Sequence, residues 1–171
     1  MDPANLPEGI RDKATVRSDG SRANPPAIEG VEVRELGAVL TRSGWIMEAF
    51  RTDWSGHGVG VQQVNYVELA PGGTTDWHRH GRQTDRLIAL GGHITLVLMD
   101  GRPASATAGQ SDVIRFGALR PLIVTVPPGV WHALKNESGA PAGYLGVFDV
   151  AYAHDAPDNY RAKPDEMPGL S

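Results

Sequence analysis

The sequence predicts an all-β domain, a barrel or a sandwich of short strands. Glycine and proline are frequent, at 21 and 13 of the 171 residues, and both favour tight turns over long helices. No segment has a sustained helical period, and short apolar segments alternate with hairpin signals such as Gly91-Gly92 and Asp100-Gly101. A chain of this length can bury one sizeable core.

Each expected strand is a short apolar or alternating segment that ends at a turn, as at Pro127-Pro128-Gly129. Residues 1–30 and 157–171 are rich in turn formers, so we expect a loose N-terminal arm and a loose C-terminal tail on either side of a barrel at residues 31–156. The expected strands are Val31–Leu36, Trp45–Phe50, Val61–Leu69, Thr75–His80, Leu87–Leu90, His93–Asp100, Ile123–Val126, Trp131–Lys135 and Ala142–Val150.

Charge and composition exclude several classes of protein. The net charge is -4 and there is no basic run, so we expect neither a nucleic acid nor a membrane as partner. The chain has no cysteine, which excludes disulfides and thiolate ligands. It contains no apolar run of membrane-spanning length and no apolar stretch near its start that would act as a signal. A cytoplasmic location and a small-molecule substrate are therefore expected.

Three histidines form the main candidate site. His78 and His80 are two residues apart in a predicted strand, so their side chains share a face. His132 begins another predicted strand, and a third imidazole from a neighbouring strand would complete a set of three nitrogen ligands. Such a set suits a divalent metal ion (Zn, Fe, Ni, Cu or Mn), with open positions for water or substrate. Without a metal, the same histidines would serve as acids, bases or hydrogen-bonding groups.

Oxygen and amide groups extend this site. Asp85, or alternatively Gln83, could supply an oxygen ligand to the same metal ion. In the segment Val61–Leu69, Gln63 and Asn65 lie on the apolar face by period-2 alternation. A buried amide without a partner is costly, so both should meet a partner, water or a ligand, and we take both as candidates for substrate binding.

The spacing of these residues resembles the two motifs of the cupin superfamily. Asp85 stands where the first motif normally has glutamate, and the glycine upstream of Pro127 is not at the usual distance. The resemblance implies a double-stranded β-helix, the jelly-roll barrel of the cupins, with His78, His80 and His132 as metal ligands and Asp85 as a possible fourth. The matching segments are Gly72-x5-His78-x-His80-x4-Asp85-x6-Gly92 and Pro127-Pro128-Gly129-x2-His132-x3-Asn136.

Within that superfamily the chain is similar to the dTDP-4-dehydrorhamnose 3,5-epimerase-like proteins. The likeness runs from about Gly44 to Tyr152. It implies a homodimer in which strands or arms are exchanged between the subunits. The segments that carry it are Gly44–Arg51, Gln63-x-Asn65, Asp100–Gly109 and Val126–His132.

The resemblance also implies catalytic roles. His78 occupies the position of the histidine that removes a proton next to the ketone of the sugar. Arg86 stands where the family has a lysine that stabilises the enolate, and arginine keeps the charge but has a different donor geometry. Tyr152 is the nearest match for the tyrosine that acts as the acid. Tyr144 is the second match, and together with Gln83 it is also a candidate for substrate binding.

Two departures from the family favour a metal site. The family has a leucine-arginine-glycine stretch whose arginine would contact the nucleotide phosphates, and here Thr74-Thr75-Asp76-Trp77 replaces it. His80 stands where the family usually has glutamine. The site has thus lost phosphate-binding charge and gained an imidazole.

Three functions follow from the sequence. The first is an epimerase or isomerase that acts on a carbonyl-containing small molecule, such as a keto-sugar, with a bound divalent metal ion (Zn, Fe, Ni or Mn). The second is a mononuclear metal cupin of the dioxygenase or lyase type. The third is a cupin that binds a small ligand without chemistry.

Overall fold

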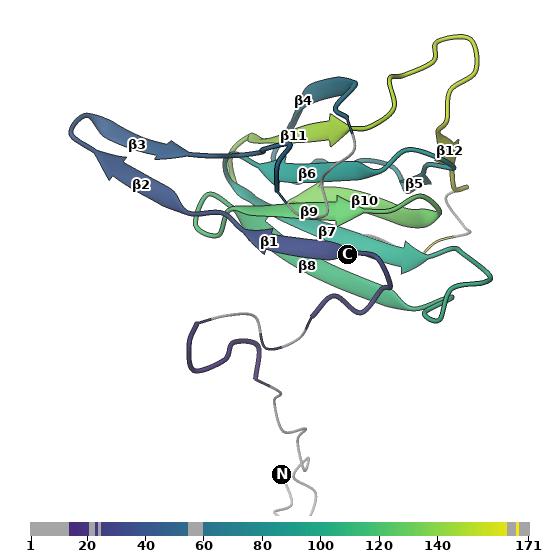
Figure 1. The fold of residues 1–171 in the computed structure, drawn as a ribbon, viewed down its shortest axis with the longest axis horizontal. Helices are drawn as coiled ribbons and strands as arrows, with labels where there is room; N and C mark the ends of the chain where they lie inside the picture. Colours follow the sequence, from purple (N-terminus) through teal and green to yellow (C-terminus); the bar gives the residue numbers. More distant parts are fainter. Residues whose placement is uncertain (1–13, 21–22, 24, 55–59, 164–166, 168–171) are drawn as a thin grey trace, which may run out of the picture.

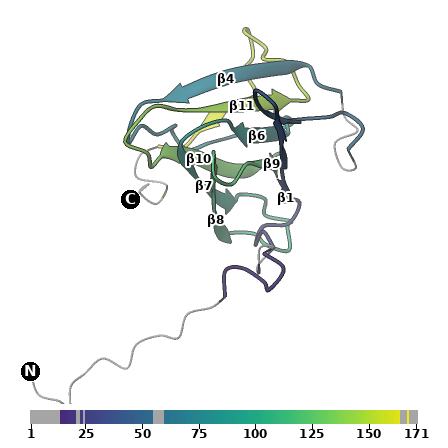
Figure 2. The ribbon, with the colours of Figure 1, turned by 90° about the vertical axis from the view of Figure 1, so that its left-hand side faces the viewer.

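Two antiparallel five-stranded sheets face each other and enclose the core of the protein (Figures 1 and 2). The computed structural model describes residues 14–20, 23, 25–54, 60–163 and 167. Every regular element in these ranges is a strand, so the all-β prediction is confirmed. Nowhere in these ranges does a helix have the length and apolar character that crossing a membrane requires.

The two sheets take strands from distant parts of the chain. The first sheet has the order β1-β9-β6-β11-β4 and the second has the order β12-β5-β10-β7-β8. The bounds in the first sheet are β1 (Glu32–Glu35), β9 (Leu122–Val126), β6 (Asp85–Ala89), β11 (Ala142–Phe148) and β4 (Gln63–Leu69). The bounds in the second sheet are β12 (Tyr160–Arg161), β5 (His78–Arg79), β10 (Val130–Asn136), β7 (His93–Asp100) and β8 (Ser111–Gly117).

A separate hairpin of β2 (Ala38–Thr41) and β3 (Gly44–Met47) extends beyond the two sheets (Figure 1). Its strands pair only with each other among the described residues. The sequence analysis missed β2, because this strand is exposed along its whole length and therefore lacks alternation between apolar and polar residues. It also missed β8, although Ile114 and Phe116 alternate there with outward-facing residues.

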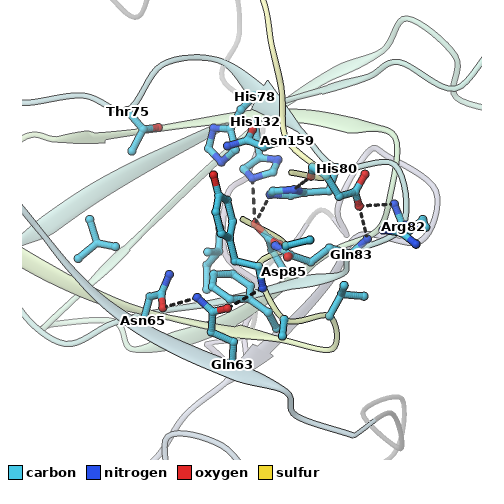
Figure 3. Close-up of a pocket in the computed structure, with 18 of the residues that line it drawn as sticks. Gln63, Asn65, Thr75, His78, His80, Arg82, Gln83, Asp85, His132 and Asn159 are labelled. Atoms are coloured by element: carbon cyan, nitrogen blue, oxygen red, sulfur yellow. Dashed lines mark hydrogen bonds and ion pairs between the residues drawn. The ribbon is translucent and has the colours of Figure 1, made fainter. Parts of the chain in front are cut away.

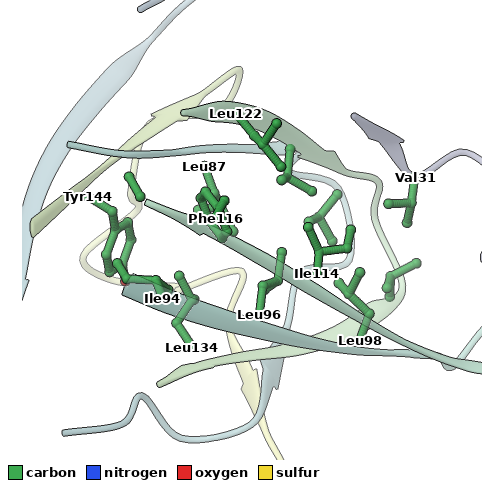
Figure 4. Packing of buried hydrophobic residues seen from close by; sticks show 14 of the residues in the cluster. Val31, Leu87, Ile94, Leu96, Leu98, Ile114, Phe116, Leu122, Leu134 and Tyr144 are labelled. Carbon is green, nitrogen blue, oxygen red and sulfur yellow. The ribbon is translucent and has the colours of Figure 1, made fainter. Parts of the chain in front are cut away.

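The main core fills the space between the two sheets (Figure 4). Alternation along the strands sends every second side chain into this space, as with Ile94, Leu96 and Leu98 of β7, each fully buried. Other members of the cluster are Leu87, Ile114, Phe116, Leu122, Val124, Leu134 and Tyr144. The apolar filling occupies one part of the barrel interior, and Tyr144 belongs both to this cluster and to the lining of the pocket described below.

A second apolar cluster covers the outer face of the first sheet. Ile88 of β6, Ile123 of β9 and Val147 of β11 are buried there together with Leu36. Partly buried side chains from the segment that follows β3 pack against them, including Phe50 and Trp54. The first sheet is therefore covered on both faces, so adjacent residues of β6 are buried on opposite sides of the sheet.

The parts of the two chain ends that lie next to the barrel are tied to it by hydrogen bonds. Asp100, which is 2% exposed, accepts hydrogen bonds from Arg102, Ser105 and Thr107, and these contacts shape the turn after β7. The same turn holds the end of the N-terminal arm, since the backbone N–H of Ala106 donates to the Glu29 carboxylate and the Arg102 guanidinium donates to the Glu29 carbonyl. Most of the expected N-terminal arm lies outside the described residues. At the other end, β12 adds a strand within the expected C-terminal tail.

Candidate functional site

A pocket of about 300 Å³ opens between the two sheets, beside the apolar core. Both sheets contribute to its lining. His78, His80 and His132 come from the second sheet or directly follow one of its strands, whereas Asp85 comes from the facing first sheet. The pocket is therefore the part of the barrel interior that polar side chains line (Figure 3).

Strand register brings the three imidazoles together. His132 of β10 pairs directly with His78 of β5, so both side chains lie on one face, and their ring centroids are 4.2 Å apart. His80 is two residues further along and shares that face, with its ring 5.6 Å from His78 and 5.9 Å from His132. The turn at Gly129 supports this arrangement, because its backbone N–H donates to the carbonyl of His80.

Each imidazole has its Nδ1 atom against a backbone carbonyl. Nδ1 of His78 lies 2.8 Å from the carbonyl oxygen of Asp76, and Nδ1 of His132 lies 3.1 Å from that of Val130. Nδ1 of His80 contacts the carbonyl oxygen of Asp158. A carbonyl only accepts, so each Nδ1 carries the proton. The Nε2 atom of a neutral ring that does not contact a carboxylate, as in His78, then has a free lone pair that is available to the pocket.

Asp85 completes the group from the opposite sheet. Its Oδ1 accepts a hydrogen bond of 2.6 Å from Gln83, and its Oδ2 lies 3.2 Å from Nε2 of His132 and 3.5 Å from Nε2 of His80. One ligand atom from each of His78, His80, Asp85 and His132 lies within 4.8 Å of all the others. Three imidazole nitrogens and a carboxylate oxygen could hold a divalent metal ion.

The surroundings of this group shift the pKa values of His78 and His80 in opposite directions. Burial disfavours the charged form of Asp85, but hydrogen bonds from His132 and His80 outweigh this effect and hold the pKa of Asp85 well below its usual range. Burial also disfavours the charged form of His80, yet the contacts with Asp85 raise the pKa of His80. For His78, burial and the nearby His132 together lower the pKa to about 3. His78 is therefore a neutral imidazole at physiological pH.

Tyr144 of β11 lines the same pocket from the first sheet. Its side chain is 7% exposed, and burial together with the negative charge of Asp85 raises its pKa to about 12. The pocket thus has a neutral base, His78, on one sheet and a protonated phenol on the facing sheet. Groups whose environments keep one as a base and the other as an acid are suited to proton transfer.

Gln63 and Asn65 lie at the open side of the pocket. Gln63 donates to Asn65 Oδ1 at 2.9 Å and accepts from the backbone N–H of Tyr152 at 2.7 Å. One hydrogen bond therefore joins the two amides, and Gln63 also holds the segment that carries Tyr152. Tyr152 lines the pocket but is half exposed, and its ring packs edge-on against His154.

The expectation that Arg86 reaches the pocket is wrong. Arg86 is adjacent to Asp85 on β6, and adjacent residues of a strand point to opposite faces of the sheet. Because Asp85 points into the pocket, the Arg86 side chain is buried on the outer face, where its guanidinium lies 6.0 Å from the centre of the Phe50 ring. Arg86 therefore has no access to an enolate formed beside His78.

The sequence analysis also missed pocket residues in the C-terminal segment. Asp158, Asn159 and Arg161 line the pocket, although this segment was expected to be a loose tail. The signal for them is weak, because β12 has only two residues and no alternation can be recognised over so short a stretch. Arg82 also lines the pocket, and its side chain and that of Arg161 are exposed.

Comparisons with known proteins agree with this architecture. No family model matches the sequence. The chain is 30% identical over 141 residues to the probable low-salt glycan biosynthesis epimerase Agl13 of Haloferax volcanii, an alignment that covers 82% of this chain and 90% of that protein. It is 29% identical over 141 residues to the spore coat polysaccharide biosynthesis protein SpsL of Bacillus subtilis, covering 81% of this chain and 91% of that protein.

A solved structure adds the fold. The crystal structure of a dTDP sugar isomerase from Desulfovibrio desulfuricans G20 superposes with a TM-score of 0.77 at 25% identity, covering 84% of this chain and 90% of that one. The barrel and its pocket thus define a cupin of the kind that epimerises sugars. The chain belongs to the dTDP-4-dehydrorhamnose 3,5-epimerase-like family, and the predicted jelly-roll fold is confirmed.

The contact between Asp85 and His80 predicts a titration that NMR can follow in metal-free protein. The ring of His80 should titrate above the ordinary value of 6.5, whereas His78 should stay neutral down to about pH 3. In Asp85→Asn the pKa of His80 should fall, because burial remains and the charge of Asp85 is gone, while the contacts with Asp158 stay. Long-range ¹H–¹⁵N correlation spectra measure both titrations. Asp155→Asn, at an exposed carboxylate, is the control, and an unchanged His80 titration in Asp85→Asn would contradict the assigned contact.

Proposed function

We propose that this protein inverts a carbon atom next to the ketone of a nucleotide-linked 4-keto-6-deoxy sugar. The observation that carries the proposal is the pairing of a neutral imidazole and a neutral phenol, His78 and Tyr144, on facing sheets of one pocket. A base and an acid on opposite sides of a sugar ring are what inversion by proton transfer needs. The sugar epimerase relatives support the same class of reaction.

In the proposed reaction, Nε2 of His78 removes the proton from the carbon beside the ketone, and the electron pair of the C–H bond forms an enolate. The phenol of Tyr144 then donates a proton to the opposite face of the same carbon, which inverts its configuration. Tyr144 replaces Tyr152 as our choice for the acid, because its side chain is buried in the pocket whereas Tyr152 is half exposed. Proton exchange with water returns both groups to their starting states.

The enolate needs positive charge nearby, and Arg86 cannot supply it. His80 is the group best placed among the described residues, because Asp85 raises its pKa and thereby favours the imidazolium. The nucleotide phosphates need positive charge as well. Arg82 and Arg161 line the pocket with exposed side chains, and in the proposal they take the role of the family arginine that Thr74–Trp77 replaces.

Solvent deuterium uptake into a 4-keto-6-deoxy nucleotide sugar tests this function. The wild-type protein should exchange the proton beside the ketone, and His78→Ala should slow the exchange about 10²–10⁴-fold, the usual contribution of a positioned general base. Tyr144→Phe should keep exchange on the His78 side and lose inversion, because the second proton donor is absent. Mass spectrometry measures the uptake and ¹H NMR measures the configuration.

Two further variants complete this experiment. Tyr66→Phe is the matched control, because Tyr66 is an exposed tyrosine whose hydroxyl contacts Glu68 and which does not line the pocket. Tyr152→Phe distinguishes the other candidate acid. Absence of exchange by the wild-type protein with several such sugars would overturn the proposed function.

The donor group also supports a bound divalent metal ion, which would take the Nε2 lone pair of His78 and is therefore an alternative to His78 as the base. His78, His80 and His132 each have Nδ1 fixed by a carbonyl and Nε2 available to the pocket, the arrangement that orients histidine ligands. With Asp85 they fit Zn, Fe, Ni or Mn. Such an ion would supply Lewis-acid chemistry at the carbonyl oxygen. The same donor set favours a mononuclear metal cupin of the dioxygenase or lyase type as the alternative function.

Elemental analysis of untagged protein tests the metal. We expect about one ion per chain, because four donor atoms converge on one point. His132→Ala should weaken binding at least about 10-fold, since even loss of a group that only supports a ligand costs 10–100-fold. His154→Ala, at an exposed histidine, is the control. A metal content far below one per chain that reconstitution does not restore would count against a metal site.

We also propose that the protein is a homodimer, as the family resemblance implies. The β2–β3 hairpin carries Leu40, Trp45 and Ile46, which are 85%, 63% and 60% exposed. Leu40 pairs directly with Trp45, so these two share one face of the hairpin, whereas Ile46 lies on the other face. A second copy of the chain would cover the apolar face of Leu40 and Trp45. The second copy would thereby extend the apolar cover on the outer face of the first sheet, where Phe50 and Trp54 already pack.

Light scattering after size-exclusion chromatography tests the dimer. Wild-type protein should elute with twice the mass of one chain, and the double variant Leu40→Asp, Trp45→Asp should elute as a monomer, because buried charge without a partner opposes association. Leu119→Asp, at an exposed leucine in the turn between β8 and β9, should leave the mass unchanged. A wild-type monomer at micromolar concentration would contradict the proposal.

A further inference from the structure

The segment Asp158–Arg161, called here the C-terminal strap, adds an edge strand next to the proposed base. Arg161 pairs with His78 and Tyr160 pairs with Arg79 in the antiparallel register of β12 with β5. Beyond the strap, the backbone N–H of Ala162 donates to the carbonyl of Trp77 at 3.0 Å. The strap therefore lies along the strand that carries His78.

Asp158 fastens the strap to the loop between β5 and β6. Its carboxylate accepts three backbone hydrogen bonds, from the N–H groups of Gly81, Arg82 and Gln83, at 2.9, 2.8 and 3.1 Å. Its carbonyl accepts from Nδ1 of His80. The loop is shaped for this contact, because a Cβ atom at Gly81 would lie 2.9 Å from Asp158 Oδ1. The strap is thus held in one position at the edge of the pocket.

Asn159, the next residue, lines the pocket, and its side chain lies beside His78 and His132 (Figure 3). Its Oδ1 atom is buried and has no hydrogen-bond partner among the described residues. A buried acceptor without a partner is unfavourable, and most such atoms in folded proteins have one. The backbone on either side of Asn159 is nevertheless held, by the Asp158 contacts before it and by the β12–β5 pairing after it.

We propose that Asn159 is a substrate-binding residue whose amide oxygen accepts a hydrogen bond from a ring hydroxyl of the sugar. The sugar would lie between His78 and Tyr144, so the identity of this ligand rests on the proposed function. The buried oxygen gains its missing partner only when the hydroxyl is present. A site with such an acceptor favours substrates that carry the hydroxyl and rejects those that lack it.

Calorimetric binding of dTDP-4-keto-6-deoxyglucose, measured beside deuterium exchange, tests this role. Asn159→Leu keeps the size of the side chain and removes the acceptor, so it should weaken binding and raise KM about 10-fold, the effect of one lost hydrogen bond. The kcat for exchange should change less, because His78 and Tyr144 remain. Asn159→Asp keeps an acceptor oxygen and should restore much of the affinity. Asp155→Leu is the control at an exposed position nearby, and thermal unfolding checks that each variant is folded.

The outcomes separate this inference from the proposed function. Exchange by the wild-type protein with unchanged binding in Asn159→Leu would overturn the inference and leave the function standing. The wild-type protein could bind the sugar without exchanging its proton. If Asn159→Leu then weakens that binding and Asn159→Asp restores it, the inference is supported and the proposed function is overturned. If Asn159→Leu and Asn159→Asp weaken binding of the sugar equally, the acceptor oxygen does not contribute to binding and the inference is overturned. A wild-type protein that neither binds nor exchanges the sugar would overturn both.

Discussion

The antiparallel pairing of β5 with β10 is the constraint on which the candidate site depends. It sets His78 directly opposite His132, and residues that pair in this way present their side chains on the same face of the sheet. His80 shares that face because it follows His78 by two residues. A shift of β5 by one residue would turn both of its histidines away from the pocket and leave Trp77 and Arg79 in their place. The short strand is held on its other edge by β12, so pairing on both sides fixes the register.

Because Asp85 and the three histidines are buried between two sheets, the charge of each depends on its neighbours. In water, a carboxylate and three imidazoles would titrate near their ordinary values, but burial makes each charge depend on a partner. Asp85 keeps its negative charge because His132 and His80 contact it, and His80 favours its positive charge because Asp85 is there. His78 lies at the far side of this pair and is left neutral. Burial and the nearby His132 thus keep His78 available as a base, whereas Asp85 favours the imidazolium form of His80.

The alternation of side chains along a strand predicts much of this site from the sequence, and it also explains which predictions are wrong. The placement of His78 and His80 on one face follows from strand alternation alone, and the composition sufficed for the all-β fold. The same rule excludes Arg86 once Asp85 points inward, so the role that the family resemblance implies for this position does not transfer to Arg86. The strap was not predictable, because its contacts join residues separated by 75 to 78 positions and depend on a loop at Gly81 with no sequence pattern of its own. Local sequence patterns do not predict which distant part of the chain a short segment will pack against.

The two-sheet arrangement also bears on the stereochemistry of the proposed reaction. Packed sheets are about 10 Å apart, so a ring bound between them would meet side chains from both sheets. His78 and Tyr144 are anchored to different sheets, so they stay on opposite faces of whatever ring occupies the space. The strap, in contrast, is anchored to the same sheet as His78, and its Asp158 carbonyl contacts the ring of His80. In the proposed complex, the contact made by Asn159 would therefore be fixed relative to the base rather than to the acid, which would hold the carbon to be deprotonated beside His78.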